Sequence, residues 1–72
     1  MKLRIETGTR DDGRTVGYLY APMKSGDVLL TVLTMEPPSL YVELAKLGES
    51  WAAKTGTKIE GVEVLSERGT IR

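Results

Sequence analysis

Hydrophobic and polar residues alternate in the first third of the chain, a pattern that is typical of β-strands with one buried face. In residues 2–9, Leu3 and Ile5 occupy alternate positions and charged residues lie between them. Residues 14–21 alternate again. Asp-Asp-Gly at 11–13 indicates a tight turn between the two runs, because glycine tolerates a positive φ. We expect the two strands to form a β-hairpin with a charged tip.

The second strand of this hairpin carries two tyrosines two positions apart. Its faces are expected to hold Val16, Tyr18 and Tyr20 on one side, and Thr15, Gly17 and Leu19 on the other. We expect Tyr18 to belong to the core, while Tyr20 either packs there or remains exposed to bind a partner. Pro22 is expected to end the strand, because proline lacks the N–H that a sheet ladder needs.

The most apolar stretch is 28–35, Val-Leu-Leu-Thr-Val-Leu-Thr-Met. Its length and β-branched content favour a strand over a helix. Alternation places Leu29, Leu33 and Met35 on one face and the other apolar residues on the opposite face. Such a strand either lies in the centre of the sheet with both of its faces buried, or it exposes one face to a partner. We favour the exposed face, with Leu29 and Leu33 as partner-binding residues; coverage by loops and termini is the alternative.

A helix is predicted over about 38–55. Prolines before it suit a first helical turn, and Ser39 is an alternative N-cap. Two rows follow at helical spacing: Leu40, Leu44, Leu47 and Trp51, and beside them Tyr41, Ala45, Gly48 and Ala52. We interpret both rows as core packing, and Gly56 as the stop of the helix.

A last long strand is predicted over 57–66, and a bulge would fit at Gly61. A turn at 67–69 is expected to precede a short edge strand at 70–72. The order β-β-β-α-β predicts one α+β domain over residues 1–72, with a small antiparallel sheet and one amphipathic helix packed on one face. The alternative for the last strand is pairing with a second copy of the chain.

The sequence has 72 residues and contains neither cysteine nor histidine. This composition removes disulfides, and it argues against zinc, haem and iron–sulfur sites. Apolar burial contributes roughly 105 kcal/mol, whereas ordering the chain costs about 108 kcal/mol. The two terms cancel. We therefore expect a very well packed core, self-association as a homo-oligomer, or docking on another macromolecule.

The same two absences bear on catalysis, because they remove the side chain that titrates near neutral pH and the best nucleophile. The glycines at 8 and 13 do not match a phosphate-binding fingerprint. Asp11, Asp12 and Asp27 lack the spacing of a calcium loop, and turn aspartates usually bond their own backbone. We expect no enzyme, no cofactor and no metal. The alternative is a small enzyme whose Tyr, Lys and carboxylate groups converge across an interface.

The net charge is zero, with ten basic and ten acidic side chains, but the charge is uneven. Residues 1–26 carry five basic and three acidic side chains, a balance of +2, and the remainder carries five and seven, a balance of −2. The basic hairpin residues expected to meet a partner are Lys2, Arg4, Arg10 and Arg14. A basic β-ribbon can bind phosphate, a DNA groove or an acidic protein surface. The alternative is a solvated sheet edge.

No stretch approaches the roughly 20 apolar residues of a membrane helix, and the N-terminus lacks the apolar region of a signal peptide. We expect a cytoplasmic protein without membrane contact. The make-up of the chain (very short, neutral, free of cysteine, and α+β without catalytic residues) resembles small accessory proteins of phages and mobile elements.

The expected function is that of a non-enzymatic protein–protein interaction module, such as a small inhibitor or adaptor. It would act by surface binding to another protein or to a protein–nucleic-acid complex, and it could do so as a homodimer. The alternative is a nucleic-acid-binding protein that uses the basic N-terminal hairpin.

Overall fold

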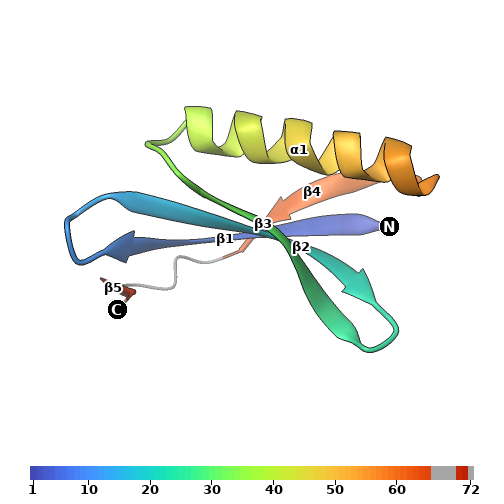
Figure 1. Ribbon diagram of the computed structural model, residues 1–72, viewed down its shortest axis with the longest axis horizontal. Coiled ribbons are helices and arrows are strands. Elements are labelled where there is room, and N and C mark those ends of the chain that lie inside the picture. The colour runs from blue at the N-terminus through green and yellow to red at the C-terminus, as the bar shows by residue number, and fades with distance from the viewer. Residues whose placement is uncertain (66–69, 72) are drawn as a thin grey trace.

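A mixed β-sheet with one helix across one of its faces makes up the fold (Figure 1). The computed structural model describes residues 1–65 and 70–71. Its elements are β1 (Lys2–Arg10), β2 (Thr15–Met23), β3 (Gly26–Thr34), α1 (Ser39–Thr55), β4 (Gly61–Val64) and β5 (Thr70–Ile71). The strand order is β3-β2-β1-β4, and β5 pairs with β1. The predicted α+β class and element order are confirmed. The turn predicted at 67–69 lies outside the described residues.

The β1–β2 hairpin is confirmed, and its turn uses the predicted residues. The Arg10 N–H donates to the Arg14 carbonyl at 2.8 Å, and the Gly13 N–H donates to the Arg10 carbonyl at 2.9 Å. Gly13 has a φ of 83°, which completes a three-residue loop of a common type. The Asp12 carboxylate accepts a hydrogen bond from the Arg14 N–H at 3.1 Å, so this aspartate stabilises the turn itself.

Pro22 does not end β2, which continues to Met23. Met23 and Gly26 pair across a two-residue turn that joins β2 to β3. The backbone N–H and C=O of Met23 therefore point toward β3. Because these groups alternate in direction along a strand, the nitrogen of Pro22 points the other way, toward β1. The β1–β2 ladder ends at the pair Arg4–Tyr20. The missing N–H of Pro22 therefore falls beyond the ladder and removes no hydrogen bond from it.

The last strand joins β1 in parallel, so the sheet is mixed rather than wholly antiparallel. The meander makes β1 and β3 run in the same direction. Helix α1 then carries the chain back to the end where β3 began, and β4 must run parallel to both. The strand prediction is wrong for residues 57–60, because β4 spans only Gly61–Val64.

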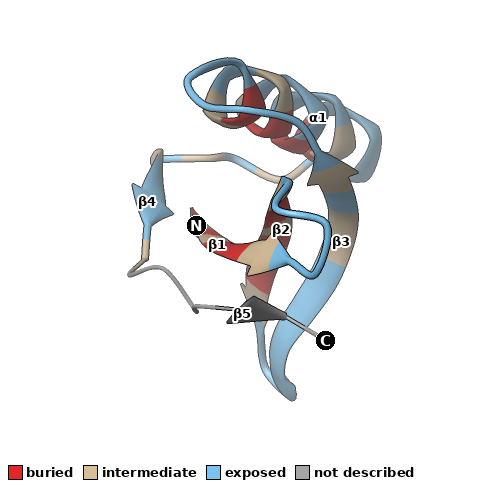
Figure 2. Ribbon diagram, turned by 90° about the vertical axis from the view of Figure 1, so that its left-hand side faces the viewer, coloured by how far each residue is buried: buried red, intermediate tan, exposed pale blue. Residues whose placement is uncertain are grey.

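The core lies between the sheet and α1 (Figure 2). Its fully enclosed residues are Leu3, Ile5, Leu19, Ala21, Leu40 and Leu44. The buried line along the helix runs through Leu40, Leu44, Gly48 and Ala52. The prediction that Leu47 belongs to the core is therefore wrong, since Leu47 lies beside this line and is 40% exposed. Glycine at 48 lets the helix backbone approach β1 closely, because a side chain there would meet Leu3.

The ends of α1 follow the sequence in part. Gly56 has a φ of 71°, and its N–H donates to the Ala52 carbonyl, so the predicted stop is confirmed. Ser39 is the first helical residue rather than the N-cap; Pro38 takes the cap position, without a side-chain hydrogen bond. Within residues 1–65 and 70–71, no helix is long and apolar enough to cross a membrane.

Candidate binding surface

The sheet face opposite α1 forms the candidate binding surface. We call it the open face and define it by Arg4, Tyr18, Tyr20, Leu29 and Val32. These residues are neighbours across the strands, because Tyr20 pairs with both Arg4 and Leu29, and Tyr18 pairs with Val32. The helix lies on the other side of the sheet (Figures 1 and 2). The buried Leu19 belongs to that side, where it lines a pocket together with helix residues. The structure therefore brings three predicted site residues, Arg4, Tyr20 and Leu29, onto one surface.

Two stacked tyrosines form the centre of the open face. The ring centroids of Tyr18 and Tyr20 are 6.4 Å apart, with an interplanar angle of 26°. Both side chains are half-buried. The prediction that Tyr18 belongs to the core is wrong, because Leu19, the residue between the two tyrosines, is the one that faces α1.

A bulge in β3 decides which of its leucines reach the open face. Leu19 pairs with Thr31 but Tyr20 pairs with Leu29, so Leu30 is an extra residue. An extra residue reverses the alternation of side chains, so Leu29 and Leu33 lie on opposite faces of the sheet. The prediction that they share a face is therefore wrong. Leu29 lies on the open face and is 48% exposed, whereas Leu33 packs against the core from the helix side. Val32 takes the place of Leu33 on the open face and is 44% exposed.

β3 is an edge strand, not the central strand that was one reading of its apolar sequence. The Met35 N–H donates to the Thr15 carbonyl of β2 at 3.1 Å. Backbone groups alternate in direction along an antiparallel strand, so Val32 and Thr34 point their N–H and C=O groups outward. Among the described residues, no strand pairs with this outer side of β3. Residues 28–35 include no charged side chain and no proline, the features with which proteins commonly protect an edge.

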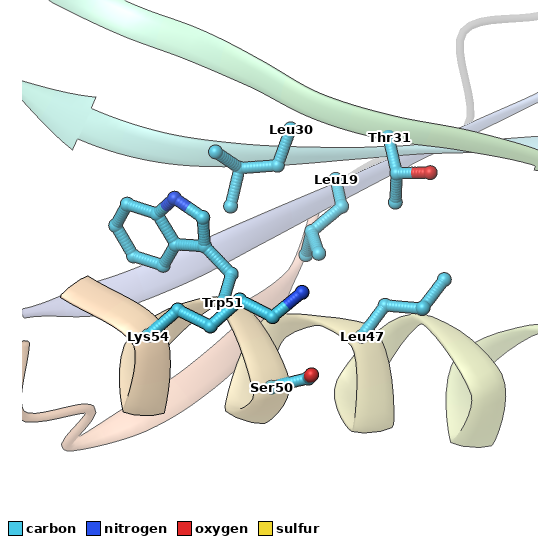
Figure 3. A pocket seen from close by; sticks show the side chains of 7 residues that line it. All are labelled: Leu19, Leu30, Thr31, Leu47, Ser50, Trp51 and Lys54. Atoms are coloured by element: carbon cyan, nitrogen blue, oxygen red, sulfur yellow. The ribbon is translucent and has the colours of Figure 1, made fainter.

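A groove of about 260 Å³ runs between β3 and α1, on the opposite side of the sheet from the open face (Figure 3). It is lined by Leu19, Leu30, Thr31, Leu47, Ser50, Trp51 and Lys54. The indole of Trp51 points toward Leu30, and Leu47 lies at the other end of the groove (Figure 3). Because β3 is the outermost strand, this mostly apolar groove follows the sheet edge. The helical spacing of Leu47 and Trp51 predicts core packing, and Trp51 does pack against the core while remaining half-buried. The position of both residues beside a sheet edge was not predicted.

Most of the predicted basic residues have polar partners in the chain. Arg4 lies between two carboxylates: its Nη1 is 3.1 Å from Asp27 Oδ2, and its Nε is 4.0 Å from Glu63 Oε2. Arg10 donates from Nη1 to Thr34 Oγ1 at 3.5 Å. Exposed pairs of this kind contribute at most about 1 kcal/mol each. Asp27 and Glu63 nevertheless balance the charge of Arg4 at the rim of the open face.

The basic residues do not form one continuous stripe. Lys2 is exposed two positions from Arg4 on β1. Arg10 and Arg14 lie together at the tip of the β1–β2 hairpin, at the far end of the strand. The Nε atom of Arg14 is 3.7 Å from Asp12 Oδ2. Arg14 thus lies apart from the open face, whereas the Arg10 side chain reaches Thr34, two positions from Val32 on β3.

Fold and surface together define a small α+β fold in which α1 covers one sheet face and, among the described residues, no helix covers the other. Comparison of the chain with protein-family models, with curated proteins and with solved structures finds no match in any of the three.

Proposed function

We propose that the chain is a non-enzymatic protein–protein interaction module of the cytoplasm, an inhibitor or adaptor that binds a larger macromolecular partner with its open face. The observation that carries the proposal is the exposure of Leu29 and Val32 beside two stacked tyrosines. Contiguous exposed apolar side chains on a small domain mark a contact surface. Tyrosine is enriched at the centres of such surfaces, because it offers a large contact area with few rotatable bonds.

The charges around the open face fit this role. Arg4, Asp27 and Glu63 form a charged border at one end of the apolar patch. An apolar centre with a polar rim is the usual anatomy of a protein interface. The compositional resemblance to phage and mobile-element accessory proteins supports the same class of function, because such proteins act by surface binding.

Replacing Leu29 with serine should remove partner binding while leaving the fold intact, because Leu29 is 48% exposed and contributes contact area rather than core packing. The matched control is Val42→Ser, since Val42 on α1 is 52% exposed and lies away from the open face. Immobilised wild type and both variants are incubated with extract of the source cells, and the retained proteins are quantified by mass spectrometry.

We expect proteins retained by the wild type and by Val42→Ser to be depleted at least about tenfold on Leu29→Ser, the loss expected for a contact residue at the centre of an interface. Equal retention on all three baits would contradict the proposal. Circular dichroism spectra confirm beforehand that both variants are folded.

Nucleic-acid binding is the second candidate function, and one observation favours it. Stacked tyrosines beside Lys2 and Arg4 on an open sheet face resemble the platforms on which unpaired bases stack. In this case a fluorescent single-stranded oligonucleotide should bind at low salt, with an affinity that falls as salt rises. Lys2→Ala combined with Arg4→Ala should reduce the salt slope by up to about 1.4, roughly 0.7 per lost phosphate contact. No binding at low salt ends this candidate.

A further inference from the structure

We infer that β3 pairs edge to edge with β3 of a second copy of the chain, so that two sheets join into one continuous sheet. The pairing is antiparallel and has two-fold symmetry. It extends the proposed function, because it would place two open faces side by side on one surface.

The outer backbone of β3 supplies the first argument. β3 is nine residues long, or about 30 Å when extended. Val32 and Thr34 direct their N–H and C=O groups away from β2, as the hydrogen bond of Met35 shows. Such a row of outward groups is a template for another strand. An extended strand is therefore the partner whose chemistry fits this edge.

The charge pattern favours a second copy of the chain as that strand. The net charge of the chain is zero, so two copies do not repel each other as wholes. Asp27 is the one charged residue of β3, and Arg4 of the same chain neutralises it at 3.1 Å. A two-fold interface brings the same surface together twice, which is favourable only where that surface carries little charge of one sign. The apolar, uncharged run from Val28 to Thr34 meets this condition.

The groove beside β3 supplies an independent argument. In a two-fold arrangement both helices lie on the same side of the joined sheet, and each groove faces the partner's groove. Leu47, 40% exposed, and the half-buried Trp51 would then be covered. A strip about 30 Å long and about 20 Å deep buries roughly 600 Å² per copy, or about 1,200 Å² in total. This is the lower limit of stable protein interfaces, so we expect a reversible dimer.

The test compares Val32→Lys with Val42→Lys by light scattering and sedimentation equilibrium over a wide range of protein concentration. The two valines have similar exposure, but only Val32 lies on the β3 edge. The wild type and Val42→Lys should reach twice the monomer mass. Val32→Lys should raise the dimer dissociation constant at least about tenfold, because two-fold symmetry places the new charge at the interface twice. A monomeric wild type, or a Val32→Lys dimer as tight as the wild type, overturns the inference.

In a second experiment, single introduced cysteines locate the interface. The natural sequence contains no cysteine, so every disulfide that forms involves the introduced residue. Cysteine is placed in turn at Thr31, Val32, Leu33 and Thr34, and Ser39→Cys is the exposed control. A disulfide between copies forms readily only where two Cα atoms lie within about 7 Å, so cross-linking should peak at one of the β3 positions nearest the two-fold axis. Faster cross-linking at Ser39 would also overturn the inference.

The two proposals fail separately. A chain that stays monomeric, and whose Leu29→Ser variant still loses its partner, refutes edge pairing and retains the open face as a binding site. A dimer that shows no difference between Leu29→Ser and Val42→Ser in partner retention refutes the proposed function and retains edge pairing.

Discussion

Replacing Leu44 with alanine should lower the free energy of unfolding by about 2–5 kcal/mol. Leu44 is fully buried between α1 and the sheet, and its Cδ1 atom packs over Gly17 of β2. Glycine has no side chain with which to fill the cavity that the truncation leaves. A domain of this size is expected to have a total stability of about 4–11 kcal/mol. The substitution therefore removes a large share of it.

Urea denaturation followed by circular dichroism measures this loss, at a protein concentration where the chain is monomeric. The control is Val42→Ala on the same helix, where the side chain is 52% exposed and the change should stay within about 0.5 kcal/mol. If Leu44→Ala and Val42→Ala unfold at the same urea concentration, the packing described for α1 is incorrect.

Gly48→Ala should destabilise the domain by up to about 2 kcal/mol, although alanine is the better helix former. In an exposed helix this change would stabilise by about 1 kcal/mol. Here the new Cβ would lie 2.5 Å from Leu3 Cδ1 and 3.4 Å from Leu19 Cδ2. Both leucines are fully buried and have little room to move. Overpacking costs about 1–3 kcal/mol, and a contact of 2.5 Å lies toward the upper end of this range, so the cost exceeds the gain in helix propensity.

A double-mutant cycle with Leu3→Ala separates the clash from other effects. Shortening Leu3 removes the atom that the new methyl group meets, so Gly48→Ala should become stabilising in that background. The measurement is again the free energy of unfolding in urea. A Gly48→Ala variant that is more stable than the wild type would show that α1 crosses β1 at a greater distance.

Local sequence signals predict the elements of this fold well. The hairpin tip follows from Asp-Asp-Gly at 11–13, and the end of α1 follows from Gly56, because each glycine has a positive φ that the local geometry requires. The periodicity of residues 40–52 predicts the helix. Turns, helix ends and helical periodicity depend on residues that are close together in the sequence, so the sequence alone is enough to predict them.

The relations between elements are harder to predict, as β3 shows. Its position at the edge depends on which strand β4 joins, and β4 joins β1 because α1 carries the chain across the sheet. The parallel direction of β4 could have been deduced from the meander and the single helix. The bulge at Leu30 could not, because nothing in the apolar run 28–35 marks an extra residue. That bulge moves Val32 onto the open face and Leu33 off it.

The same limits apply to the candidate site. Leu29, Tyr20 and Arg4 meet on the open face. The sequence indicates each of them as a candidate, but their meeting on one face was not predicted, because it depends on strand register. The groove was missed because the helical spacing of Leu47 and Trp51 looks like core packing whether or not a strand lies beneath them. Burial depends on how far the sheet extends under the helix, and β3 is its last strand on that side.

The central claim is that the outer edge of β3 is a contact surface, and amide hydrogen exchange tests it most directly. The N–H of Met35 bonds to β2 within the chain and serves as the internal reference. We expect the outward N–H groups of Val32 and Thr34 to become as protected as that of Met35 at high protein concentration, and to lose this protection on dilution and in Val32→Lys. Rapid exchange of Val32 and Thr34 at every concentration, with Met35 still protected, would contradict the claim.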